Sequence, residues 1–403
     1  MLTFVRTIAA IGLVLVAWLL HGSRSREPVM RAPIVRLAVK HPWLITTAMA
    51  TGAIVVGAAL LISGVVPIGA SSGHWTITAA LLDFAKTRSV ATHSWGINPP
   101  SLGDDMLVLR GGGHYESACV ACHGGPGRSI PPVMMAMTPS PPLLADRIAR
   151  WAPEELFSIV KHGIKFTGMP GWPVQQRDDE VWAMVAFLRR LPDLDGAAYR
   201  RLVFGELSGE VGAAGSTSDP TPQTVRNVCW RCHGIDGTGR GRGAFPSLAG
   251  QRAVYIAASL RAFRERTRSS GIMGEVAAKL NDTAIRDIAA YYERLPSREP
   301  DRPVAVDASR ARGGAIAAHG IAQRDVPACV ECHGPADRAK NPAYPQLASQ
   351  HAAYLMSQLS LLQERRRGGT AHVNLMHIFV NRLRDDEIQD VARYYAAIPG
   401  SNP

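Results

Sequence analysis

The sequence predicts an all-α protein, with three tandem helical units behind an apolar amino-terminal segment. Three observations lead to this prediction. The chain of 403 residues is 46% hydrophobic and 19% charged, which is enough apolar sequence for several packed units and too much for a disordered chain. The string Cys-x-x-Cys-His occurs three times. Residues 44–66 carry no charged side chain.

The amino-terminal segment, residues 1–74, is predicted to be a membrane anchor of one or two helices. Residues 44–66 are long enough to cross the hydrocarbon core of a bilayer as a helix. A second apolar run at about residues 2–20 reaches that length only with Arg6 included. The stretch between the two runs has a net charge of about +4, and positive loops stay in the cytoplasm. We therefore expect everything after about Gly73 to lie outside. The alternative is a cleaved signal peptide, but no Ala-x-Ala-like site follows either run.

An internal repeat follows, and its register is clearest at its end. After each Cys-x-x-Cys-His string, a methionine precedes an aspartate and then a proline at identical spacings: Met169, Asp178, Pro192; Met273, Asp282, Pro296; Met376, Asp385, Pro399. Apolar residues between aspartate and proline recur at helical spacing, so each repeat is predicted to end in an amphipathic helix with the aspartate capping its start. The second and third repeats also share the strings FPSLAGQ (245–251) and YPQLASQ (344–350), which indicates a duplication.

Linkers rich in Gly, Ser, Thr and Pro, or in Pro and charge, divide the chain. We expect domains at residues 75–204, 222–297 and 304–403, joined by linkers at 205–221 and 298–303. A helix is predicted at about Pro153 to His162. The stretch from His74 to Arg110 is predicted to include a helix with apolar residues on one face, lying on a membrane, against a partner or over the first domain.

The six cysteines are all used by the repeated string, which is the attachment pattern of c-type haem. Two thiols three positions apart on a helical turn can each bond a vinyl group, and the next histidine then faces the iron. A zinc site would need further Cys or His ligands at zinc spacing. The sequence therefore predicts three covalent haem c groups, attached through Cys119, Cys122, Cys229, Cys232, Cys329 and Cys332, with His123, His233 and His333 as iron ligands.

The sixth iron ligand is predicted from the repeat register. A single methionine is usually core packing, but Met169, Met273 and Met376 recur at one position, on what we expect to be an irregular loop before the last helix. Met134, Met135 and Met137 in the first domain and His377 in the third are alternatives. His/Met ligation fills both axial positions and suits electron transfer.

Small residues beside the motifs fit this interpretation. Gly124, Gly234 and Gly334 follow the histidines and allow a tight turn. Carbonyls at Pro141, Pro246 and Pro345 are candidates to fix the imidazoles, with ordinary turn chemistry as the alternative.

With these motifs each unit resembles a class I cytochrome c domain. The second and third together resemble the tandem dihaem cytochromes. The first, with TGMPGW at 167–172, resembles the monohaem domains in cytochrome subunits of membrane-bound dehydrogenases. The fold expected is thus three tandem class I cytochrome c domains after the anchor. The second domain departs from the pattern, because only residues 221–228 precede its first cysteine, so its opening helix is short or borrowed from a neighbour.

The resemblance implies a membrane-anchored electron carrier on the periplasmic side of the cytoplasmic membrane. It would take electrons from a dehydrogenase, such as one acting on alcohol, gluconate or aldehyde, and pass them to quinone or a terminal oxidase. The alternative is a haem enzyme, a peroxidase or a sulfur-compound dehydrogenase, with one exchangeable axial position. The net charge of +11 belongs partly to the cytoplasmic loop and is offset by haem propionates, so no nucleic-acid partner is expected.

Overall fold

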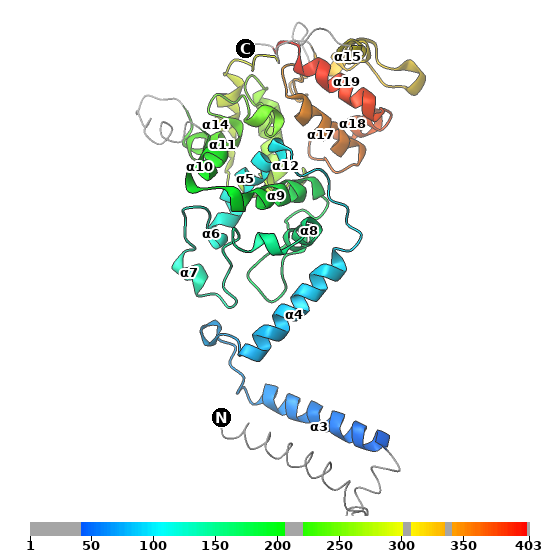
Figure 1. Cartoon of the computed structure of the whole chain (residues 1–403). Coiled ribbons are helices and arrows are strands. Elements are labelled where there is room, and N and C mark those ends of the chain that lie inside the picture. The colour runs from blue at the N-terminus through cyan, green and yellow to red at the C-terminus, as the bar shows by residue number, and fades with distance from the viewer. Residues whose placement is uncertain (1–41, 206–220, 301–307, 335–340, 401–403) are drawn as a thin grey trace, which may run out of the picture. The chain divides into compact units, whose positions relative to one another are not determined.

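The computed structural model describes residues 42–205, 221–300, 308–334 and 341–400. The chain divides into two compact units, residues 1–72 and 73–403. The described residues form helices and two isolated bridges, Gly125 with Arg128 and Ile321 with Val326, but no strand (Figure 1). This confirms the prediction of an all-α protein.

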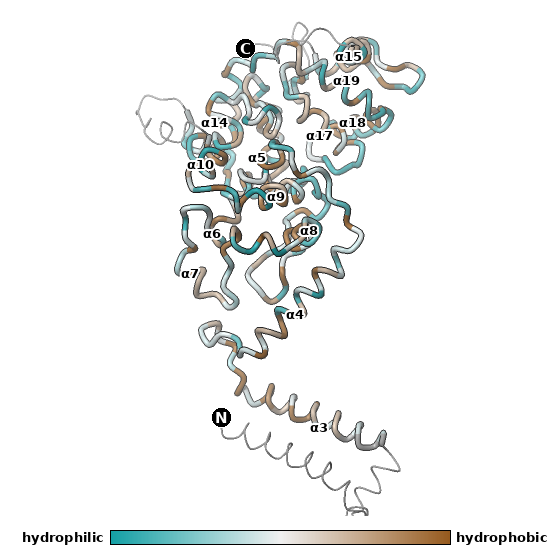
Figure 2. Tube along the Cα trace, in the orientation of Figure 1, coloured by the Kyte–Doolittle hydropathy of each residue, from teal (hydrophilic) through white to brown (hydrophobic). Residues whose placement is uncertain are grey.

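The first unit contains helix α3, Pro42–Ile62, a stretch without charged residues that is apolar along most of its length (Figure 2). It overlaps the predicted helix at 44–66 and ends four residues before Val66. Over the part of the chain described, no helix combines the length and the hydropathy needed to cross a membrane. The predicted helix at about residues 2–20 lies outside the described residues.

The second unit starts with helix α4, Thr76–His93, in the stretch where the sequence predicts a helix. Its apolar residues Ile77, Leu81 and Phe84 are exposed. Asp83 of this helix forms an ion pair of 3.8 Å with Arg150 of the first domain. The helix thus contacts that domain without burying its apolar residues in it.

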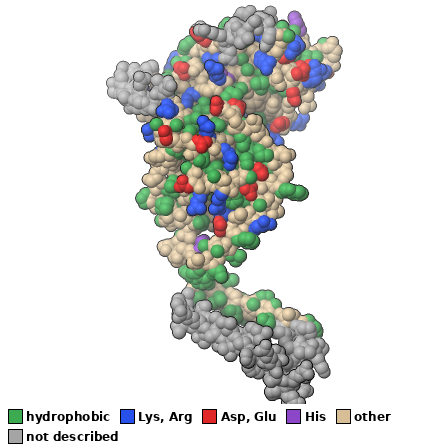
Figure 3. All heavy atoms as spheres, in the orientation of Figure 1, with side chains coloured by type: hydrophobic (Ala, Val, Ile, Leu, Met, Phe, Trp, Pro, Cys, Tyr) green, Lys and Arg blue, Asp and Glu red, His purple; other side chains and the backbone are tan. Residues whose placement is uncertain are grey.

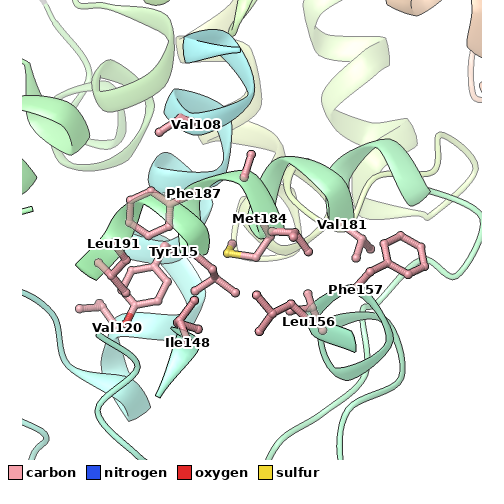
Figure 4. Packing of buried hydrophobic residues seen from close by; sticks show 14 of the residues in the cluster. Val108, Tyr115, Val120, Ile148, Leu156, Phe157, Val181, Met184, Phe187 and Leu191 are labelled. Carbon is pink, nitrogen blue, oxygen red and sulfur yellow. The ribbon is translucent and has the colours of Figure 1, made fainter. Parts of the chain in front are cut away.

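The first domain contains the predicted helix at Pro153–His162. Its principal helices are α5 (Asp105–His114), α6 (Val120–His123), α7 (Pro132–Met135), α8 (Pro153–His162), α9 (Asp178–Arg190) and α10 (Gly196–Phe204), and a π-helical turn η4 (Tyr115–Cys119) joins α5 to α6. Helices α5 and α9 cross at Gly111, where a Cβ atom would lie 2.1 Å from the carbonyl oxygen of Ala183. Around this crossing the core packs Tyr115, Phe187 and Met184 (Figure 4).

Among the described residues, which resume at Thr221, no long helix lies between that residue and the second motif. The second domain contains a π-helical turn η8 (Val225–Cys229), followed by α11 (Trp230–His233), α12 (Ala253–Arg264), α13 (Met273–Ala277) and α14 (Asp282–Glu293). An opening helix that is short or borrowed from a neighbour stays a prediction, because residues 206–220 lie outside the described part of the chain. The core gathers Ile256, Ile285 and Tyr292 around Val225, which is fully buried.

The third domain begins with a long opening helix, as the first does. It consists of α15 (Ala308–His319), α16 (Val330–His333), α17 (Ala352–Gln363), α18 (Val373–Val380) and α19 (Asp385–Ala396). Short 3-10 turns complete the fold: η3 (Ala70–Ser72), η5 (Ile148–Arg150), η6 (Leu191–Asp193), η9 (Gly241–Gly243) and η10 (Ala322–Arg324). Helices α15 and α19 cross at Gly313, where a Cβ atom would lie 2.0 Å from the carbonyl oxygen of Asp390.

The amphipathic last helix of each repeat is confirmed, and it begins at the repeated aspartate in all three: α9 at Asp178, α14 at Asp282 and α19 at Asp385. The predicted capping role is wrong. The aspartates are the first helical residues, a position where a carboxylate suits the helix dipole. Asp178 also forms an ion pair with Lys161, and Asp282 with Arg261 and Arg264. In α14 the cap is Asn281, whose side chain accepts a hydrogen bond from the Ala284 amide.

We expect Gly313→Ala to destabilise the third domain. Alanine favours a helix over glycine by about 1 kcal/mol, but here its methyl group would meet a backbone oxygen that cannot move aside. Overpacking of this kind costs about 1–3 kcal/mol, which should lower the midpoint of denaturant unfolding. Gly196→Ala at the start of α10 is the control, since its Cβ atom would lie no closer than 3.4 Å to any neighbour. Equal midpoints for the two variants would contradict this account of the crossing.

Candidate haem-binding sites

Each Cys-x-x-Cys-His string forms one helical turn, as its spacing predicts, and in the first two domains this turn continues a π-helical turn. The second cysteine and the histidine lie in α6, α11 and α16, and the first cysteine immediately precedes each helix. None of the six cysteines forms a disulfide. Burial raises the pKa of Cys119 and Cys229 to about 12 and that of Cys232 and Cys329 to about 11.

Each of the three histidines makes the same kind of hydrogen bond, which orients its ring. Nδ1 donates to a proline carbonyl: His123 to Pro142 at 2.9 Å, His233 to Pro246 at 3.0 Å and His333 to Pro345 at 2.9 Å. Burial lowers the pKa of all three rings, although the bond to the carbonyl opposes it. A neutral ring with its proton on Nδ1 has a lone pair on Nε2, which is the form that binds iron.

The proline predictions are confirmed for Pro246 and Pro345 and wrong for Pro141, because Pro142 supplies the carbonyl in the first domain. Both prolines stand two residues before a leucine, but Leu144 packs on the core as Leu248 does in the second domain, whereas Leu143 is exposed.

The tight turn after each histidine is confirmed: Gly124, Gly234 and Gly334 have φ values of 61°, 78° and 86°. A contact that the sequence does not predict holds each of these turns. A tyrosine hydroxyl donates to the glycine carbonyl in each domain, from Tyr115 at 2.8 Å, Tyr292 at 3.5 Å and Tyr395 at 3.5 Å. Tyr115 precedes its motif, whereas the other two lie in the last helix, so no common sequence position signals the contact.

The second domain brings its predicted ligands to one cavity, which contains about 1820 Å³ of empty space, part of it open to solvent. Cys229, Cys232, His233 and Met273 line it together with apolar side chains such as Ile256, Leu260 and Phe263. The methionine is not on an irregular loop as predicted. It is the first residue of α13, because the Ser270 hydroxyl accepts hydrogen bonds from the Ile272 and Met273 amides and starts a helical turn there.

In the first domain Met169 lies between α8 and α9, outside any helix, as predicted. Two of its alternatives lie near the same site. The Cys122 thiol is 3.8 Å from the Met134 sulfur, and the Met137 methyl group packs against Gly168 beside Met169. Met135 is 53% exposed. Met169 as ligand therefore stays a prediction.

In the third domain Met376 lies within α18, not on a loop, because the apolar run VNLMHIFV forms a helix. It packs with Leu362, Val380 and Ile388. The alternative, His377, has its Nε2 within 2.7 Å of the Arg367 carbonyl and donates to it. The nitrogen that usually binds iron is thus engaged, which favours Met376 of the two.

Two buried arginines mark the boundary between the second and third domains. Arg268 donates to the Tyr354 hydroxyl at 3.3 Å, and Arg367 donates to the Tyr255 hydroxyl at 2.8 Å. These pairs occupy equivalent positions in the two repeats and each crosses the boundary. Among the described residues no carboxylate forms an ion pair with either guanidinium. Although burial opposes it, their positive charge lowers the pKa of Tyr255 to about 8.

Arg268, Arg367 and Tyr255 line the same cavity as Cys229 and Met273. A buried charge needs a partner of opposite sign. The apolar lining, two thiols, a correctly oriented imidazole and an excess of positive charge all fit haem c, whose propionates are anionic.

The motif segments also contact one another across domains. A Cβ atom at Gly113 in α5 would lie 3.3 Å from the Cys232 sulfur, and Arg231 donates to the Ser117 hydroxyl at 3.3 Å. Between the second and third domains, Ser247 and Gln350 exchange hydrogen bonds of 2.9 Å in both directions, and Gln251 and Gln346 exchange bonds of 3.0 Å. These reciprocal bonds lie in the FPSLAGQ and YPQLASQ strings. The match between the two strings is the sequence feature that could have indicated this contact.

These features define a c-type cytochrome, and comparison with known proteins agrees. The family described as cytochrome c oxidase, cbb3-type, subunit III matches residues 107–188, and the cytochrome c family matches residues 222–295. The thiosulfate dehydrogenase electron acceptor of Stutzerimonas stutzeri is 36% identical over 42% of this chain and 79% of its own length. Cytochrome c4 of Thiocapsa roseopersicina is 34% identical over 46% of this chain and 96% of its own. The solved thiosulfate dehydrogenase of Marichromatium purpuratum is 36% identical, with a TM-score of 0.39, over 43% of this chain and 36% of that one.

The chain belongs to the multihaem c-type cytochromes. It carries three covalent haem c groups, at Cys119 and Cys122, at Cys229 and Cys232, and at Cys329 and Cys332.

The ligand assignment in the third domain can be tested by the absorption band of the methionine–iron bond. We expect Met376→Ala to remove one haem's share of this band, and His377→Ala to leave it intact because that ring is bonded to the Arg367 carbonyl. The measurement is the oxidised spectrum at equal haem content. Loss of the band in the histidine variant alone would reverse the assignment.

Proposed function

We propose that this chain is an electron-transfer cytochrome that accepts electrons from a dehydrogenase of the thiosulfate-oxidising kind and relays them through its three haems to quinone or a terminal oxidase. The observation that carries the proposal is the set of contacts that join each haem-binding domain to the next. Arg231, within the second Cys-x-x-Cys-His string, donates to Ser117, two residues before the first string. The second and third domains are joined by the bonds between Ser247 and Gln350, which follow their strings.

Each haem iron, when bound, supplies reversible one-electron oxidation and reduction. The protein's part is to hold the imidazoles in one orientation and tautomer through the proline carbonyls, and to keep the three sites close. Electron transfer between carriers weakens steeply with distance, so direct contact between successive haem-binding domains favours a relay. Filling of both axial positions by histidine and methionine would leave no open coordination position for substrate, which supports a carrier over a haem enzyme.

The donor class is supported by the relatives, since two of them bear the name of thiosulfate dehydrogenase electron acceptor. On the face shown in Figure 3, basic and acidic side chains of the second unit are interspersed. This arrangement does not favour a polyanionic partner such as nucleic acid.

The donor can be tested by mixing the oxidised cytochrome with a purified thiosulfate dehydrogenase and thiosulfate. We expect reduction of all three haems, seen as the full change in the α-band, and no reduction by thiosulfate alone. An equimolar single-haem cytochrome serves as a control for non-specific reduction. Oxidation of thiosulfate by this chain with an artificial acceptor, without the dehydrogenase, would refute the carrier role and favour the enzyme alternative.

We also propose that residues 1–72 attach the chain to the cytoplasmic membrane, with the haem domains on the periplasmic side. The support comes from sequence: the uncharged stretch at 44–66, the positive stretch before it, and a cofactor that is attached outside the cytoplasm. The full chain should stay in the membrane fraction after carbonate washing. Residues 73–403, which form a compact unit, should be released from the periplasm with three haems when exported by a cleavable signal. Release of the full chain by carbonate would refute attachment.

A further inference from the structure

A buried carboxylate of the first domain lies against the second. Glu180 in α9 is only 3% exposed. Its Oε1 accepts from the Ser270 hydroxyl at 2.6 Å, and its Oε2 accepts from the Gly271 amide at 2.7 Å and the Trp172 indole at 3.1 Å. Arg177 adds an ion pair at 3.0 Å. Every donor is directed at one carboxylate, and two of them belong to the neighbouring domain.

The segment that Glu180 holds leads directly to the proposed iron ligand. The Ser270 hydroxyl that donates to Glu180 also accepts from the Met273 amide at 3.0 Å. Arg177 donates to the Ser269 carbonyl at 2.7 Å. Residues 269–271 are therefore bonded on one side to the first domain and on the other to the turn that starts α13.

The Ser269–Gly271 segment also packs closely against the first domain. A Cβ atom at Gly271 would lie 2.4 Å from the Trp172 indole nitrogen and 3.1 Å from Oε2 of Glu180. Glycine is thus required for the segment to approach the first domain. Glu180 itself lines the cavity that holds His233 and Met273.

In the third repeat the equivalent glutamate bonds within its own domain. Glu387 stands at the same place, two residues after the repeated aspartate. Its Oε2 accepts from the Arg384 amide at 2.9 Å, which caps its own helix, and its other oxygen pairs with Arg324. Glu180 instead bonds to the Ser270 hydroxyl and Gly271 amide of another domain. The second repeat has Ala284 at this place.

We propose that Glu180 is a positioning residue that fixes the Ser269–Gly271 segment and so sets the placement of Met273 at the second haem. The first domain thereby controls the sixth-ligand side of its neighbour. This inference rests on the proposed electron-transfer role and on Met273 as ligand. Because methionine ligation raises the reduction potential, loosening this segment should lower the potential of the second haem and leave the other two unchanged.

The test compares Glu180→Gln with Glu387→Gln in the full holo-cytochrome. Glutamine keeps the shape but replaces one acceptor oxygen with a donor, so a buried donor loses its partner. We expect amide hydrogen exchange at Gly271 and Met273 to become about tenfold faster or more, with a fall in one of the three potentials in a redox titration. Glu387→Gln should change neither. Ser270→Ala, which removes the link between Glu180 and the Met273 amide, should reproduce both effects if Glu180→Gln fails to fold.

Exchange at residues 269–274 that is equal in Glu180→Gln and Glu387→Gln would overturn the proposal. So would faster exchange with all three potentials unchanged. The ligand assignment is checked separately by Met273→Ala. If that variant keeps the complete methionine–iron band, Met273 is not a ligand and the inference fails, while the contact of Glu180 with the segment stands. Failure of the dehydrogenase to reduce the wild-type chain would instead refute the donor and leave this result untouched.

Discussion

The hydrogen bond from Nδ1 of each motif histidine to a proline carbonyl is the interaction on which the three sites depend. It decides which ring nitrogen carries the proton and therefore which one can bind iron. The rest of each domain serves this bond. A glycine with positive φ turns the chain away after the histidine, and a tyrosine hydroxyl holds the glycine carbonyl.

The same peptide unit that accepts from the imidazole also faces the neighbouring domain. Pro246 offers its carbonyl to His233, and the Ser247 amide of that unit donates to Gln350. In the third domain the Pro345 carbonyl and the Gln346 amide do the same with His333 and Gln251. Hydrogen bonds in series polarise one another. The imidazoles of His233 and His333 are therefore each coupled through one peptide to a side chain of the other domain.

Much of this architecture could be predicted from the sequence, for reasons that are local. The spacing of Cys229, Cys232 and His233 defines the attachment turn, and the apolar periodicity after Asp282 and Asp385 defines the last helices. The shift from Pro141 to Pro142 and the helical placement of Met376 arise from packing that the repeat register does not contain. Glu180 and Arg268 could not be found in this way, because their partners are distant in the chain and belong to other domains.

The prediction that the repeated aspartates cap the last helices is wrong for a similar reason. An aspartate at the start of a helical pattern is expected to be the cap. In α14, however, Asn281 takes that position one residue earlier. Its side chain accepts from the Ala284 amide, so Asp282 is left to pair with Arg261 and Arg264. Boundaries of this kind depend on which neighbouring side chain competes best, and the repeat alone does not decide it.

The reciprocal bonds between the second and third domains make that interface isologous: the same patch of each repeat is used against the other. Such a surface closes on itself. A further copy of the repeat could not use this patch while the two repeats hold each other. The first domain contacts the second through other residues, and Glu180 bonds to the Ser270 hydroxyl and Gly271 amide there instead of capping its own helix.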